Sequence, residues 1–176
     1  VQPFVSTGEQ DPNSGAAGYD FDASGVIVGG DSEVAEGRTL GMALAYQSVD
    51  IDAVDGPAQS ADVNSLRLIG YGTQMLQAGT QLRAMVDFGS GDVESVRRLA
   101  YDNRMAFGDY DLDSYHVGLG VDHQLMSDSD LTAMISLGVD YSHIATDDYT
   151  EQEAGGLNQH VESQDVRSLV ASFSGQ

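Results

Sequence analysis

Serine, histidine and aspartate all occur in this 176-residue chain, so nucleophilic catalysis is the first chemistry to consider. The Gly-x-Ser-x-Gly sequence that presents a nucleophilic serine on a tight turn does not occur. His116 and Asp122 fall on one parity of an alternating segment, whereas His123 falls on the other. Nothing in this pattern positions a nucleophile beside a base, and histidine also suits a polar wall. We therefore expect no enzymatic activity and no catalytic residue.

Two ligand-binding patterns are present only in part. Asp50-x-Asp52-x-x-Asp55-Gly56 resembles a calcium loop, but an EF-hand loop has its third acid one residue earlier and a glutamate further on. The Gly-x-Gly pairs at 70–72 and 118–120 lack the third glycine and the helix of a dinucleotide site. The absence of cysteine excludes thiolate metal sites and disulfides. We expect no bound metal and no cofactor.

The charge balance is strongly acidic. The formal net charge is −21, and all seven basic residues are arginine. Because phosphate binding needs a cationic face, this balance argues against a nucleic acid partner. The acids are either solvated loop residues that repel one another or ligands for divalent cations, and the first interpretation is favoured.

The elements that would carry these residues alternate like strands. In the segment 131–142, apolar side chains fall on one parity, and with the exception of Met134 the other parity is small or polar. The apolar residues are Leu131, Ala133, Ile135, Leu137, Val139 and Tyr141. A strand sends successive side chains to opposite faces, and a run of about 11 residues suits a tilted strand crossing a bilayer. Tyr141 ends the apolar run, where a membrane interface places aromatic residues.

The same reading along the chain predicts about eight strands and no helix. The predicted strands are Val1–Thr7, Tyr19–Gly30, Thr39–Val49, Val63–Leu76, Leu82–Phe88, Leu112–Leu125, Leu131–Tyr141 and Leu157–Ser174. The predicted connections are Asp31–Gly37, Asp50–Asp62, Gln77–Thr80, Gly89–Asp111, Met126–Asp130 and Asp147–Gly156. They alternate between short and long, as in an antiparallel up-and-down β-barrel of the outer-membrane type. A soluble antiparallel barrel or sandwich with an apolar core is the less favoured alternative.

In a membrane barrel, the apolar parity would face lipid and the small or polar parity would line the lumen. The expected lumen residues include Gly41, Ala43, Ala45, Gly118, Gly120 and Asp122. Arg83 shares a parity with Asp87 and opposes apolar neighbours, so we expect it in the lumen. Arg67 and Arg167 also lie in strands. In the lumen they would pair with acids, whereas on the lipid face each would cost roughly 2–4 kcal/mol at the midplane.

Several stretches carry a family pattern in a consistent order. They are Gly18–Asp31 (GYDFDASGVIVGGD), Leu40–Tyr46 (LGMALAY), Leu68–Thr73 (LIGYGT), Phe88–Asp92 (FGSGD) with Arg97-Arg98, Tyr141–Ile144 (YSHI) with Asp148–Glu151 (DYTE), and Ser168-Leu169 near Gly175. Together they resemble the β-barrel translocator domain of bacterial autotransporters, the type V secretion proteins. The resemblance implies an outer-membrane barrel that supports export and surface anchoring of an N-terminal passenger.

The resemblance also sets further expectations. Its partners would be outer-membrane lipid, the passenger of the same longer chain and the outer-membrane barrel assembly machinery. The family barrel has about twelve strands and ends on an aromatic residue. Residues 1–176 are therefore expected to be a single, partial barrel domain that lacks the last strands and the helix threading the pore. The alternative is a small closed barrel, membrane or soluble, that acts as a binding, adhesion or structural module with acidic loops.

The resemblance assigns roles to some acidic residues. His143, Asp148 and Glu151 belong to a motif at the barrel rim rather than to a catalytic site. Some members of the family cut their passenger inside the barrel with lumenal acids. Asp87, Asp122 and Asp140 are the acids expected on the lumen side, although that cleavage also needs an asparagine in the absent helix.

Overall fold

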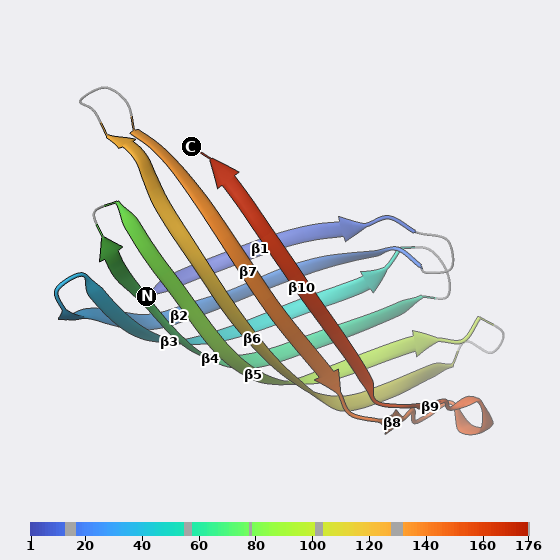
Figure 1. The fold of residues 1–176 in the computed structure, drawn as a ribbon. Coiled ribbons are helices and arrows are strands. Elements are labelled where there is room, and N and C mark those ends of the chain that lie inside the picture. Colours follow the sequence, from blue (N-terminus) through green and yellow to red (C-terminus); the bar gives the residue numbers. More distant parts are fainter. Residues whose placement is uncertain (13–16, 55–57, 78, 101–103, 128–131, 176) are drawn as a thin grey trace.

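The computed structural model describes residues 1–12, 17–54, 58–77, 79–100, 104–127 and 132–175. Eight strands form one antiparallel sheet in which neighbours along the chain are neighbours in space, with β10 following β7 (Figure 1). These strands are β1 (Gln2–Gln10), β2 (Tyr19–Ala35), β3 (Arg38–Ala53), β4 (Gln59–Gln77), β5 (Thr80–Arg98), β6 (Met105–Ser127), β7 (Thr132–Thr146) and β10 (Gln164–Gly175). Between β7 and β10 lie β8 (Tyr149–Thr150), the 3₁₀ turn η1 (Gly155–Leu157) and β9 (His160–Val161). Within the described residues, no helix is long and apolar enough to cross a membrane.

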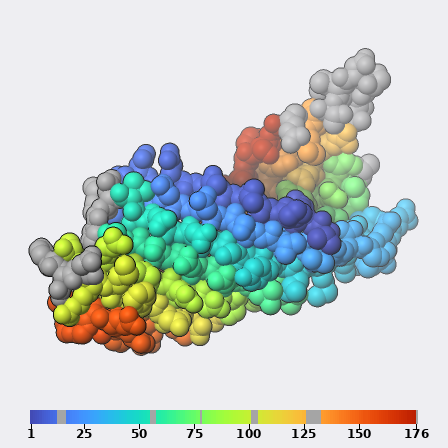
Figure 2. All heavy atoms as spheres, turned by 180° about the vertical axis from the view of Figure 1, so that it is seen from behind, coloured from blue at the N-terminus to red at the C-terminus, as the bar shows by residue number. Residues whose placement is uncertain are grey.

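The sheet curls into a half-barrel and does not close (Figure 1). β1 and β10 are its two edges, and in the part of the chain that the structure describes they pair only with β2 and β7. From behind, the strands lie side by side in sequence order as one continuous wall (Figure 2). The alternative of a closed eight-stranded barrel is therefore wrong. The predicted antiparallel all-β architecture is confirmed.

Each strand has two chemically different faces. Leu44, Leu68, Phe88 and Tyr115 lie in register on what we call the outer face, and each keeps 37–60% of its surface exposed. Ala45 follows Leu44 on β3, and Arg67 precedes Leu68 on β4; these two residues are in register on the opposite, inner face. Among the described residues, no large side chain is fully buried. The soluble alternative with an apolar core is wrong, because the apolar side chains form an exposed belt.

Several strands are longer than the sequence predicted. The predicted loop Gly89–Asp111 is mostly strand, because β5 runs to Arg98 and β6 begins at Met105. The predicted turn Asp31–Gly37 and the predicted loop Asp50–Asp62 are shortened in the same way by β2, β3 and β4. The added residues mix polar and apolar types without a continuous apolar row, and a ladder of backbone hydrogen bonds needs no such row.

The predicted alternation of connections survives in shortened form. On one side, β2–β3 and β4–β5 are tight hairpins whose turns contain Gly37 and Gly79 with φ of 69° and 78°. Only glycine adopts this conformation without strain. On the other side lie the longer connections, ending with residues 147–163. Parts of the predicted turns, the segment Asp55-Gly56 and the residues Leu131 and Gln176 lie outside the described residues.

Candidate functional site

A line of polar side chains crosses the inner face from β4 to β7. Arg67 donates from Nε and Nη2 to Oδ1 of Asp87, at 3.0 and 2.5 Å. The other oxygen of Asp87 lies 3.0 Å from Nδ1 of His116, and Nε2 of His116 lies 3.2 Å from Oδ1 of Asp140. Four neighbouring strands each contribute one residue to this line.

The ladder explains why these residues meet. Asp87 pairs directly with His116, and Asp140 pairs with Gly118, two residues further along β6. Because side chains on one face of neighbouring strands lie about 5 Å apart, or 7–8 Å diagonally, polar side chains at these positions reach one another. The pattern of two residues per repeat therefore brings together groups that lie far apart in the sequence.

The line is half-shielded from solvent. The side chain of Asp87 is 8% exposed and that of His116 is 14% exposed, whereas that of Asp140 keeps 45% of its surface. Two carboxylates flank the imidazole of His116, and the guanidinium of Arg67 binds the more buried of the two, Asp87.

A second ion pair lies on the same face. Arg83 donates from Nε to Oδ2 of Asp122 at 2.5 Å and from Nη2 to Oδ1 at 3.1 Å. The predicted lumen-side placement of Arg83 is thus confirmed. Two glycines on β6 make room for these groups. An added Cβ at Gly118 would lie 2.6 Å from Oδ1 of Asp140, and one at Gly120 would lie 2.9 Å from Nη2 of Arg83.

Arg167, the third of the arginines that the sequence analysis placed in strands, lies on the outer face. Arg167 pairs with His143 across β10 and β7, so it shares the outer face with Tyr141 and Tyr115. The rings of Tyr115 and His143 are 4.9 Å apart, and those of Tyr115 and Tyr141 are 5.8 Å apart. This polar and aromatic cluster lies where the apolar belt ends, as the sequence predicted for Tyr141.

The structure does not bring together His116, Asp122 and His123, the residues considered above for catalysis. His116 and Asp122 share the inner face, but each is engaged with other partners. His123 lies on the outer face, where its Nδ1 is 2.8 Å from Oγ1 of Thr80. In the described part of the chain, no group of three or more histidine and acidic side chains is placed to hold a metal.

The two ends of the acidic segment predicted as a loop are instead paired strands, since β3 runs to Ala53 and β4 begins at Gln59. Asp50 and Asp62 are in register on β3 and β4, beyond the apolar belt. The pKa of Asp62 is raised because its protonated carboxyl can donate a hydrogen bond to Asp50 and because the negative charge of Asp50 lies close by. Their crowding fits the favoured interpretation, in which the acids are solvated and repel one another.

Beyond the belt, the connection between β7 and β10 folds back onto the inner face of β5 and β6. Arg97 donates from Nε and Nη2 to the two carboxylate oxygens of Glu151, at 2.8 and 2.5 Å. Glu151 also accepts a bond from the backbone N–H of Gln159 at 2.8 Å. Tyr149 stacks on Tyr110 with 4.4 Å between the ring centroids. The sequence placed Glu151 at the rim but did not reveal its arginine partner.

This ion pair is well shielded from solvent. The side chains of Arg97 and Glu151 keep 17% and 6% of their surface. The hydrogen bonds from Arg97 lower the pKa of Glu151, and Glu151 raises the pKa of Arg97. Asp148, from the same predicted motif, is exposed.

With this geometry established, comparison with known proteins identifies the family. Residues 1–174 match the family model of the autotransporter β-domain. The chain belongs to this family. The autotransporter fold is also the one seen in solved structures. The translocator domain of the autotransporter NalP from Neisseria meningitidis superposes with a TM-score of 0.84 and 15% identity, covering 98% of this chain and 59% of that one. The β-domain of the Bordetella autotransporter Brka gives a TM-score of 0.66 and 20% identity, covering 97% of this chain and 68% of that one.

The relatives found by sequence are outer membrane proteins of Rickettsia species. Outer membrane protein B of Rickettsia prowazekii is 26% identical over 173 residues, and that of Rickettsia rickettsii is 25% identical. In both cases the match covers 93% of this chain and 10% of the relative, so the chain spans about a tenth of their length. The resemblance predicted from the sequence is confirmed. The domain lies in the bacterial outer membrane, with its outer face toward lipid and its inner face toward the lumen.

Proposed function

We propose that this domain forms part of an outer-membrane translocator barrel that supports export and surface anchoring of an N-terminal passenger. The passenger would be carried on the same longer chain, with residues 1–176 acting as one domain. The observation that carries the proposal is the contrast between the two faces. A line of hydrogen-bonded polar groups crosses the inner face, whereas the outer face is an exposed apolar belt.

The inner face suits a polypeptide in transit. A polypeptide with unpaired backbone groups needs water or polar partners. The polar side chains of the inner face can act as such partners, and its glycines leave room for water. Charges that already pair within the wall, such as Arg83 with Asp122, attract a passing chain less than isolated charges would. The wall is therefore wettable but offers few strong binding sites.

The pairing of the strands supports a role for the outer-membrane barrel assembly machinery. Each strand of the large sheet hydrogen-bonds to its neighbour in sequence order. A strand that lies in lipid needs its backbone N–H and C=O groups paired. A folding partner in the membrane that holds the strands while they pair would meet this need.

Disulfide trapping can test the export proposal, because the chain has no cysteine of its own. Ser168 and Leu169 are exposed neighbours on β10, facing the lumen and lipid respectively. In the full-length protein with one cysteine placed in the passenger, Ser168→Cys should form a disulfide with the passenger during export. Leu169→Cys is the matched control and should not. Equal trapping by both variants, or surface display of the passenger without this domain, would refute the proposal.

A further inference from the structure

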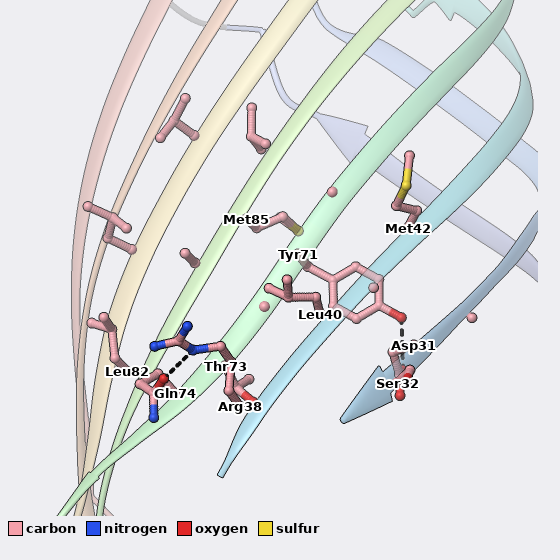
Figure 3. A pocket seen from close by; sticks show the side chains of 18 residues that line it. Asp31, Ser32, Arg38, Leu40, Met42, Tyr71, Thr73, Gln74, Leu82 and Met85 are labelled. Atoms are coloured by element: carbon pink, nitrogen blue, oxygen red, sulfur yellow. Dashed lines mark hydrogen bonds between the residues drawn. The ribbon is translucent and has the colours of Figure 1, made fainter. Parts of the chain in front are cut away.

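A hollow interrupts the lipid-facing belt where β4 crosses it. Along β4 the outward residues change from leucine at positions 66 and 68 to Gly70 and Gly72. Ala84, also small, is in register with Gly72 on β5. Because glycine and alanine do little to fill the surface, these positions form the floor of a hollow of about 1030 Å³. Figure 3 shows residues that line it, among them Arg38, Leu40 and Met42.

Apolar side chains flank this floor on both sides. Leu40 and Met42 lie along one wall and keep 52% and 63% of their surface. Val86 and Leu119 lie along the other and keep 38% and 57%. Most of the lining residues share the outer parity, so the hollow opens toward lipid. The lining extends along β3 from Arg38 to Met42 and reaches across the neighbouring strands, and we call this hollow the groove.

A cation lies at the end of the groove nearest the tight hairpins. Arg38 starts β3, directly after the turn that contains Gly37, and lines the groove. Its Nε donates to Oε1 of Gln74 at 2.5 Å (Figure 3). Its two terminal nitrogens have no acceptor among the described residues, and no described acid pairs with it. By contrast, Arg67, Arg83 and Arg97 each bind a carboxylate.

We propose that this groove binds one diacyl phospholipid, with its phosphate on Arg38 and an acyl chain along Gly70 and Gly72. The proposal rests on the outer-membrane location of the domain. Guanidinium groups bind phosphate through paired hydrogen bonds, and the free nitrogens of Arg38 can supply them. Charge complementarity therefore selects a phospholipid head group over an uncharged lipid.

The length of the groove fits this occupant. Arg38 and Met42 are four residues apart on β3, which corresponds to a rise of about 13 Å. The hydrocarbon region of a bilayer is about 30 Å thick, so the groove spans roughly one leaflet. A head group at Arg38 then places the chain beside the glycines. The lipid would belong to the leaflet on the side of the tight hairpins.

The glycines allow a clean perturbation. An added Cβ at Gly70 would meet only Val86, at an ordinary contact distance of 3.6 Å from Cγ1. At Gly72 it would lie 2.7 Å from Cδ2 of Leu40, so substitution there would disturb the wall. Gly70→Leu therefore fills the groove without a backbone clash. Ala171→Leu on the outer face of β10 is the matched control, since it adds bulk outside the groove.

The test measures lipid retention by the purified full-length protein in nanodiscs, using native mass spectrometry. The two probes are dioleoyl phosphatidylglycerol and dioleoylglycerol, which differ by the phosphate-containing head group. The unmodified protein and Ala171→Leu should retain the phospholipid about tenfold better than dioleoylglycerol. Arg38→Gln should lose this preference, and Gly70→Leu should retain both probes about tenfold less.

The proposal is overturned if Arg38→Gln keeps the preference or Gly70→Leu retains lipid like the control. Heat-modifiable gel mobility and surface display of the passenger are measured on the same variants. If the unmodified protein inserts and exports its passenger but shows no lipid preference, only the proposed lipid binding in the groove is refuted. A protein that fails to export its passenger refutes the proposed function instead.

Discussion

Replacing Glu151 with alanine should open the connection between β7 and β10 while leaving the sheet folded. The substitution leaves the guanidinium of Arg97, 17% exposed, without its carboxylate. Removing one partner of a buried ion pair costs about 3–5 kcal/mol, and we take the lower end because the pair lies near the rim. Two backbone hydrogen bonds between Phe107 and Gln152, at 3.1 and 2.8 Å, remain to hold part of the connection.

Hydrogen exchange of backbone amides measures this opening directly. The backbone N–H of Glu151 donates to the carbonyl oxygen of Gln159, and the backbone N–H of Gln159 donates to the side-chain carboxylate of Glu151. Both amides therefore report on the ion pair. A loss of about 3 kcal/mol corresponds to exchange that is roughly a hundredfold faster. Glu162→Ala is the control, because Glu162 is exposed on the same connection. Equal exchange in the two variants, or faster exchange throughout the sheet, would refute this reasoning.

The same pair predicts a pH dependence. Because Arg97 lowers the pKa of Glu151 below its ordinary value of 4.5, the pair stabilises the connection fully above that pH. The stabilisation is lost as the pH falls through the lowered pKa. After correction for intrinsic exchange rates, the difference between the unmodified protein and Glu151→Ala should therefore shrink on acidification below 4.5. A difference that grows on acidification would contradict the assigned sign.

Three further perturbations test other parts of the structure. Asp87→Ala should destabilise the barrel by about 3 kcal/mol in urea titrations in detergent, because its arginine and histidine partners lose their acceptor. Gly108→Leu should displace the Tyr149 ring, because a Cβ at position 108 would overlap it, and should increase proteolysis within 147–163. An unchanged cleavage rate would count against this contact. Leu119→Arg should cost roughly 2–4 kcal/mol on the lipid face, whereas Ser172→Arg on the lumen face should cost far less, by the same titration.

The alternation of side chains made the two faces of the sheet predictable. Strand periodicity is two residues, so a single apolar row such as Leu40 to Tyr46 assigns every other residue to a face. Arg83 was placed correctly because its immediate neighbours are apolar. Arg167 was not placed, because the final strand alternates only weakly and its face depends on pairing with β7.

Two features could not be predicted from the sequence. The strand extensions beyond the membrane belt lack a continuous apolar row, so the alternation that predicts a strand is missing there, and backbone pairing leaves no trace in residue type. The Arg97–Glu151 pair joins residues 54 positions apart through a connection that folds back on itself. Polar residues in a predicted loop carry no signal of such a contact, although an arginine and a glutamate that both end up buried require one.

The central claim is that one face of the sheet meets water in a lumen and the other meets lipid. Single cysteines along β7 test it most directly, in intact outer membranes carrying the full-length protein. A water-soluble maleimide should label Ser136→Cys and Ser142→Cys on the inner face. Leu137→Cys and Val139→Cys, which replace side chains 54% and 50% exposed on the outer face, should stay unlabelled until the membrane is dissolved. Labelling that is uniform along β7, or strongest at Leu137→Cys and Val139→Cys, would contradict the assignment of the two faces.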